Sequence, residues 1–215
     1  MPPTETPFQV LSREIYYRID ERYNLTFSKR IRLRSLRDGT NAFLDKIAWS
    51  GGAAGLPRCS ADRACVVRPS PDRHGLWDYF RVEFAAPLRS GQETVVELRW
   101  PNLGNWTNSK PFVSTSVPTA GGRVRFDVHI PKAARNSDEC FLETLGSVDA
   151  ADPLDRGTAA FDQSGDLRWD IDAPEHDRHF RIAWLWHPII TGPLPEPAAA
   201  PQNADDQRGR VVGSR

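Results

Sequence analysis

A period-two alternation of apolar and polar residues recurs in separate segments and strongly constrains the fold of this chain. In the segment NLTFSKRIRLRS, Leu25, Phe27, Ile31 and Leu33 alternate with polar and basic residues. The same alternation occurs in DYFRVEF, TVVELRW and RVRFDVHI. Successive side chains of a strand point to opposite faces, so the pattern indicates half-buried β-strands.

Short turns separate these segments. Four dipeptides are typical of tight turns: Asp38-Gly39, Ser90-Gly91, Gly121-Gly122 and Gly165-Asp166. The segments between them are too short for long amphipathic helices, which favours antiparallel over parallel sheets. We expect about nine to eleven strands, too many for one comfortable open sheet. The sequence therefore predicts an all-β fold, an antiparallel two-layer β-sandwich.

The N-terminal segment allows two interpretations. Thr6-Pro7-Phe8-Gln9 has the residues of a helix start, and Phe8, Leu11, Ile15 and Ile19 follow at helical spacing. Alternatively, Ile15, Tyr17 and Ile19 alternate as in a strand. Tyrosines and β-branched residues favour a strand from about residue 14, after a short helical turn at most.

The composition changes after Trp186. The last segment is rich in proline, alanine and polar residues, so we expect a single sandwich domain at 8–190 and a disordered tail at 191–215. No apolar run is long enough to cross a membrane. The first residues lack the basic and apolar regions of a secretory signal, and the expected location is therefore cytoplasmic.

The segment HFRIAWLWHP is the most aromatic of the chain. In an extended strand Phe180, Ile182, Trp184 and Trp186 share one face, so we expect the tryptophans to close the core. Trp77 and Tyr79 lie out of phase with the apolar residues of their segment, and Trp106 lies in a polar loop. These three aromatic residues are therefore candidates for contact with a partner.

Charge is balanced over the chain but uneven along it. The chain has 28 basic and 28 acidic residues, and 12 of the acidic ones lie between residues 138 and 178. We expect this acidic segment to be a solvated loop, lying against a basic face. Arg30, Arg32 and Arg34 share one strand face, where acidic side chains of a neighbouring strand would compensate them. A phosphate-bearing ligand is the alternative, so the three arginines are a second candidate partner-binding patch.

Local motifs of known chemistry are missing. There is no phosphate-binding loop, dinucleotide fingerprint, zinc-protease motif or nucleophile elbow, which disfavours an enzyme. A hydrolase assembled in space from His176, His179, Asp170 and a serine remains an alternative. The spacing of Cys59, Cys65 and Cys140 does not match a metal site, so no metal or cofactor is predicted. Free thiols are expected, although a Cys59–Cys65 disulfide is sterically allowed.

Four short motifs, in order, are similar to those of uncharacterised all-β domains of high-GC bacteria. They are RLRSLRDGTNAF, PLRSGQE, FDVHIP and FRIAWLW. The resemblance implies a β-sandwich accessory domain of signalling or regulatory proteins and no catalytic residues. The sequence thus predicts a non-catalytic interaction or regulatory module that binds a protein partner. A small-ligand or carbohydrate-binding sandwich is the alternative, and nucleic acid is disfavoured because the net charge is zero.

Overall fold

The computed structural model describes residues 7–48, 55–74, 77–101, 103, 112–117, 122–147, 150, 152–175 and 177–185. Thirteen strands and one short 3-10 helix lie within these ranges. They are β1 (Phe8–Ile19), β2 (Leu25–Ser35), β3 (Thr40–Ala48), β4 (Arg58–Ala61), β5 (Cys65–His74), β6 (Trp77–Leu88), β7 (Glu93–Trp100), β8 (Phe112–Val117), β9 (Arg123–His129), η1 (Lys132–Ala134), β10 (Glu139–Leu145), β11 (Asp155–Ala160), β12 (Asp166–Asp172) and β13 (Arg178–Trp184).

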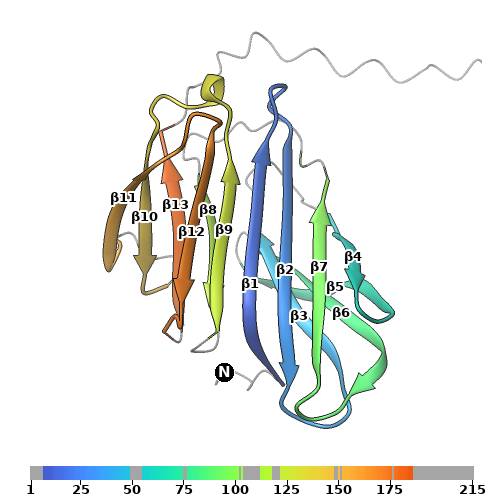
Figure 1. The fold of residues 1–215 in the computed structure, drawn as a ribbon. Coiled ribbons are helices and arrows are strands. Elements are labelled where there is room, and N and C mark those ends of the chain that lie inside the picture. The colour runs from blue at the N-terminus through green and yellow to red at the C-terminus, as the bar shows by residue number, and fades with distance from the viewer. Residues whose placement is uncertain are drawn as a thin grey trace, which may run out of the picture.

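The strands form three sheets in two layers (Figure 1). One layer is a six-stranded sheet of order β12-β9-β1-β2-β7-β4. The other layer is divided into a four-stranded sheet, β11-β10-β13-β8, and a three-stranded sheet, β3-β6-β5. β1 and β9 pair in parallel, whereas the other strand pairs are antiparallel. The predicted all-β sandwich is therefore confirmed, with one parallel pairing in its six-stranded sheet.

Aromatic side chains join the two layers. Tyr17 of β1 contacts Trp184 of β13, with ring centroids 5.5 Å apart, and this contact packs the six-stranded sheet on the four-stranded one. Trp100 of β7 lies 5.6 Å from Phe80 of β6, which packs the same sheet on the three-stranded one. Trp184 is only 3% exposed. The prediction that this tryptophan lies in the core is therefore confirmed.

The described residues form thirteen strands, two more than the upper expected number, and two of the edge strands have no clear apolar face. β4 has four residues, and β11 is exposed at almost every position. The acidic segment is also not a loop, since it forms β10, β11, β12 and the first residue of β13. Its carboxylates face arginines across strands, as Asp170 does with Arg125 of β9 at 2.8 Å.

β1 begins at Phe8, six residues earlier than predicted, and residues 8–13, where the sequence allowed a short helical turn, belong to the strand. A β-bulge between Val10 and Ser12 explains the helical spacing. The inward side chains are Phe8 and Val10 before the bulge, and odd-numbered residues from Arg13 to Ile19 after it. One extra residue thus shifts the alternation, and the apolar residues on the two sides of the bulge together have a spacing similar to that of a helix. The predicted tail at 191–215 lies outside the described residues.

Candidate functional site

A cavity of about 680 Å³ lies where the second layer is divided. We call it the inter-sheet cleft. Its lining comes from β1, from β3 and β6 of the three-stranded sheet, and from β8 and β13 of the four-stranded sheet. The apolar part of the lining includes Phe8, Val10, Phe43, Leu44 and Val117. Cavities of this volume are typical of sites for small molecules.

A buried ion cluster of Arg13, Lys29 and Asp45 lies at the cleft. The side chains of Arg13, Lys29 and Asp45 are at most 7% exposed. The Asp45 carboxylate lies 3.1 Å from Lys29 Nζ and 3.7 Å from Arg13 Nη2. Arg13 Nη1 donates hydrogen bonds to Thr115 Oγ1 at 3.1 Å and to the Ser116 carbonyl at 3.2 Å. Arg13 of β1 therefore contacts both β3 and β8, on the two sides of the division.

The charges of this cluster stabilise one another. Burial acts to raise the pKa of Asp45, but the cationic Lys29 and Arg13 hold it below its ordinary value. Asp45 is thus a carboxylate at neutral pH. The Arg13 Nε atom is buried and has no hydrogen-bond partner among the described residues. Arg13 is therefore fixed at its tip while its Nε donor stays unused.

A serine and a histidine form a second polar pair in the cleft. Ser116 Oγ lies 3.0 Å from His179 Nδ1. Burial, followed by the nearby positive charges of Lys46 and Arg181, lowers the pKa of His179 to about 4. The imidazole is therefore neutral at neutral pH, and no described carboxylate bonds to it. A base with such a low pKa removes a proton from serine poorly, so the pair is suited to hydrogen bonding rather than to nucleophilic catalysis.

Basic side chains line the rest of the cleft. Lys46 Nζ lies 5.9 Å from the ring centroid of Tyr79, within reach of a cation–π interaction. Arg178 forms an ion pair with Glu175. Arg81 is exposed and has no ion-pair partner in the described part of the chain. With Arg13 the described lining has four cationic groups against two carboxylates, Asp45 and Asp177.

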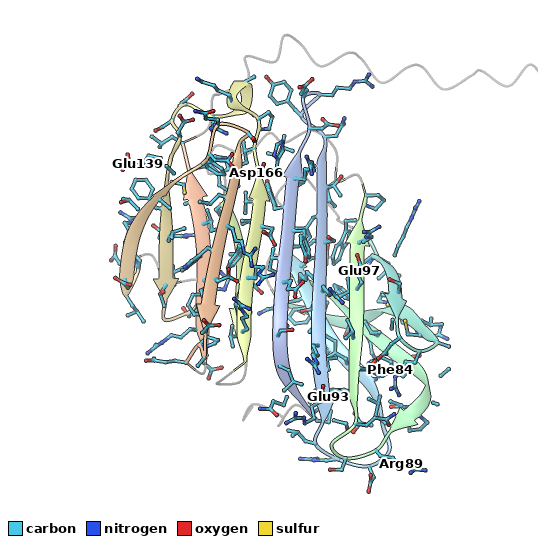
Figure 2. The ribbon with its side chains drawn as sticks, in the orientation of Figure 1. Phe84, Arg89, Glu93, Glu97, Glu139 and Asp166 are labelled. Atoms are coloured by element: carbon cyan, nitrogen blue, oxygen red, sulfur yellow. The ribbon has the colours of Figure 1, made fainter. Side chains whose placement is uncertain are left out.

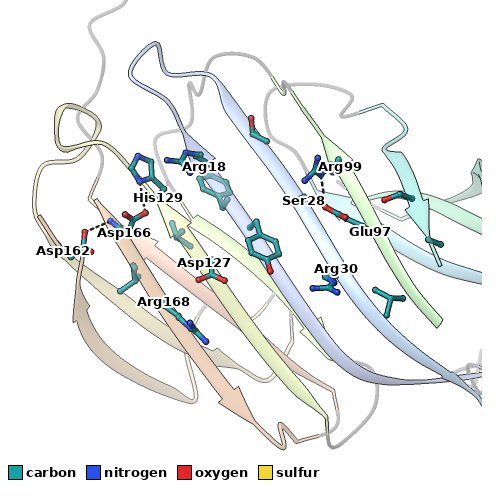
Figure 3. A pocket seen from close by; sticks show the side chains of 18 of the residues that line it. Arg18, Ser28, Arg30, Glu97, Arg99, Asp127, His129, Asp162, Asp166 and Arg168 are labelled. Atoms are coloured by element: carbon teal, nitrogen blue, oxygen red, sulfur yellow. Dashed lines mark hydrogen bonds and ion pairs between the residues drawn. The ribbon is translucent and has the colours of Figure 1, made fainter. Parts of the chain in front are cut away.

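A second hollow, of about 970 Å³, lies on the outer face of the six-stranded sheet (Figure 3). We call it the outer-face groove. The strand register places acidic and basic residues alternately across this face, in the order Asp170, Arg125, Glu14, Arg30 and Glu97. Asp170 and Arg125 form one ion pair of this row. Figure 3 shows a second pair, between Glu97 and Arg99, at 2.8 Å. The acidic and basic side chains of this row therefore compensate one another's charges.

The three arginines predicted as a patch belong to this outer face. Arg30 lies 4.0 Å from Glu14 of β1, and Arg32 and Arg34 lie 2.6 and 2.7 Å from Glu93 of β7. Figure 2 labels Glu93 on β7, beside β2. The prediction that acidic residues of neighbouring strands compensate the arginines is confirmed. The arginines and Tyr79 lie on different sheets and do not form one surface.

The structure brings together few of the other predicted site residues. Tyr79 lines the inter-sheet cleft, whereas the Trp77 side chain, Trp106 and His176 lie outside the described residues. Asp170 is bound by Arg125 and Arg168 on the outer face, away from the cleft that His179 lines. Of the members of the predicted hydrolase cluster that the structure describes, only His179 and a serine meet.

The sequence prediction missed the buried ion cluster, although a signal for it was present. Lys29 interrupts the inward series of β2, and Asp45 that of β3. Arg13 holds an inward position in β1. A charged residue at a core position needs a partner, so three such residues on strands that are consecutive in the sequence indicate a common buried site.

No group of three or more histidine, cysteine or acidic side chains in the described ranges could hold a metal ion. Within the same ranges no helix is long and apolar enough to span a lipid bilayer.

Comparison with known proteins finds similarity to parts of solved structures, and none at the level of sequence families. No family model and no curated protein matches the chain. A mutant two-domain M1 zinc metallopeptidase bound to L-tryptophan has 12% identity and a TM-score of 0.42, over 84% of this chain and 43% of that one. An M1 zinc metallopeptidase mutant from Deinococcus radiodurans, bound to a Tyr-Ser-Ala substrate, has 13% identity and a TM-score of 0.41, over 82% and 42%. The chain thus spans less than half the length of these enzymes, and similarity at this level assigns it to no family.

Proposed function

We propose that the chain is a non-catalytic binding module whose inter-sheet cleft takes a small amphipathic anion. The observation that carries the proposal is the combination of an apolar lining with an excess of cationic side chains in one cavity. Ligand sites are mostly apolar, with a few polar groups that orient the ligand. Phe8, Val10 and Phe43 would contact the apolar part of such a ligand, and Arg81 and Lys46 would contact its charge.

The neutral His179 fits binding better than catalysis. Because its pKa is about 4, it adds no charge near neutral pH and acts as a hydrogen-bonding group. Ser116 holds one of its ring nitrogens at 3.0 Å. The buried Arg13 ties β1 to β3 and β8, so both sides of the cleft are held in place before a ligand arrives.

The experiment uses anilinonaphthalene sulfonate, a dye that is both aromatic and anionic and fluoresces in apolar sites. We expect saturable binding to the folded protein. Arg81→Ala should weaken the affinity by about five-fold, since a partly solvated ion pair contributes about 1 kcal/mol.

The matched control is Arg68→Ala. Arg68 is opposite Arg81 on the neighbouring strand β5, but it does not line the described cleft. Its variant should bind the dye as the wild type does. Absence of saturable binding, or an equal loss in both variants, would overturn the proposal.

A protein partner, as the sequence predicts, is the second candidate function. The outer face of the three-stranded sheet favours it, because Leu44 and Val66 are 47% and 52% exposed there. The register places both on the same face as Tyr79 and Arg81. This role would suit the accessory domain that the sequence resemblance implies. A pull-down should then retain a partner with the wild type and lose it with a folded Leu44→Ser/Val66→Ser variant, and equal capture by both would contradict it.

A further inference from the structure

Two cysteine side chains are in contact near the β4 edge of the six-stranded sheet. Cys59 lies in β4 and Cys65 is the first residue of β5, and their Sγ atoms are 3.0 Å apart. Both are half-buried and pack against the core. We propose that Cys59 and Cys65 are a site of reversible oxidation, which forms a disulfide and fastens the six-stranded sheet to the three-stranded sheet.

The backbone on both sides of the pair is already in place. Cys59 pairs with Leu98 of β7, and Cys65 pairs with Phe84 of β6. A disulfide has an S–S length of about 2.05 Å, so the sulfur atoms need to approach by about 1 Å only. Rotation of the two side chains supplies such a movement without breaking either strand pairing. The third thiol, Cys140, lies in β10 of the four-stranded sheet and is buried.

The oxidant in this proposal is a low-molecular-weight disulfide such as glutathione disulfide. One protein thiolate attacks it, forms a mixed disulfide and releases one glutathione. The second protein thiolate then attacks the protein sulfur of the mixed disulfide and releases the other glutathione. Two protein thiols are thereby oxidised to one disulfide, and one glutathione disulfide is reduced to two glutathione molecules that carry the two protons.

The Cys59 thiol is protonated at neutral pH. Burial, followed by the hydrogen bond with Cys65, raises its pKa to about 12. Only the thiolate attacks a disulfide, so oxidation should proceed faster as the pH rises.

The position of the pair gives the disulfide a structural consequence. In the three-stranded sheet, β5 lies at the edge opposite β3, and β3 lines the inter-sheet cleft. A bond between β4 and β5 anchors that sheet at its far edge. We therefore expect oxidation to raise the midpoint of thermal unfolding, since the crosslink restricts the unfolded chain.

The test equilibrates the full chain in glutathione buffers of graded redox ratio, at mildly alkaline pH. Free thiols are then alkylated in denaturant and counted by mass spectrometry. We expect the reduced protein to carry three labels and the oxidised protein one, on Cys140. Trypsin cleaves after Arg63, so an unreduced digest should contain residues 59–63 joined to the peptide that begins at Ala64.

Two conservative variants and one control complete the design. Cys59→Ser and Cys65→Ser should each lose both the crosslinked peptide and the shift in thermal midpoint, and Cys140→Ser should keep both. Dithiothreitol should reverse the crosslink in the wild type. Three labels at every redox ratio, or glutathione adducts without the crosslinked peptide, would overturn the proposal.

Discussion

Three charged side chains occupy positions that the alternation of their strands reserves for apolar residues. Arg13, Lys29 and Asp45 come from three different strands and meet in one buried cluster. Charges removed from water are costly unless they are paired, and breaking one member of such a cluster leaves the others uncompensated. Asp45 is the only carboxylate in contact with both cations among the described residues, so the cluster depends on it.

Asp45→Asn is therefore expected to destabilise the protein strongly. The substitution keeps the shape of the side chain but removes the charge that compensates Lys29 and Arg13. We expect a loss of about 3–5 kcal/mol in the free energy of unfolding, measured by urea denaturation. The control is Asp172→Asn, because the Asp172 side chain is 80% exposed in its ion pair with Arg123. Similar losses in the two variants would show that the cluster contributes little.

The buried His179 predicts a specific loss of stability in acid. The unfolded chain binds a proton at this residue near pH 6.5, whereas the folded chain binds it only near pH 4. Protonation thus favours the unfolded state between these values. His179 should therefore not lower the free energy of unfolding above about pH 6.5. As the pH falls to about 4, it should lower this free energy by roughly 3 kcal/mol in all.

The measurement compares urea denaturation of the wild type and His179→Gln across that pH range. Glutamine does not titrate, so the variant should lose less stability than the wild type on acidification. Parallel curves would mean that His179 is protonated as easily in the folded state as in the unfolded state.

At the scale of elements, strands with one buried face could be predicted and others could not. β2 and β7 alternate regularly, because each has one face on the core. β11 exposes most of its side chains, so burial imposes no pattern on its sequence. In β1 the bulge shifts the phase, and two correct half-patterns together resemble a helix. Alternation therefore reports which face is buried, and it fails where no face is buried or the register changes.

The residues that line the inter-sheet cleft are harder to predict from the sequence than the strands. Tyr79 was found because it is out of phase in its segment, but its neighbours in space come from strands distant in sequence. Ser116 and His179 are 63 residues apart. Their proximity depends on the pairing of β8 with β13, which no local pattern indicates.

The contact between β1 and the start of β9 makes a glycine prediction. Gly122 has a φ of +79°, and a Cβ there would lie 2.7 Å from the Leu11 carbonyl oxygen, at the bulge. Gly39 has a similar φ of +76° but nothing within 4 Å. We expect Gly39→Ala to cost about 1 kcal/mol and Gly122→Ala about 3 kcal/mol, since crowding adds to backbone strain. Urea denaturation of both variants measures the difference. Equal losses in the free energy of unfolding would mean that the β1 backbone moves away from the new Cβ at little cost.

At the scale of the whole molecule, the chain contains two small sandwiches that share one sheet. Strands β1 to β7 form four strands of the six-stranded sheet and the complete three-stranded sheet. Strands β8 to β13 form the other two strands and the complete four-stranded sheet. The parallel pairing of β1 with β9 joins the two parts, and Figure 1 shows these strands side by side at the centre. The contacts of Tyr17 with Trp184 and of Arg13 with Thr115 reinforce this junction.

Because the junction includes a seven-residue strand pairing and buried side chains, we expect residues 8–190 to unfold as one cooperative unit. The calorimetric and van't Hoff enthalpies of unfolding should then agree. Phe80→Leu affects the core beside the three-stranded sheet, and Trp184→Phe affects the core beside the four-stranded sheet. In a single cooperative unit each substitution lowers the same transition midpoint. If the two sandwiches were independent, two transitions would appear, and each substitution would shift only the transition of its own part.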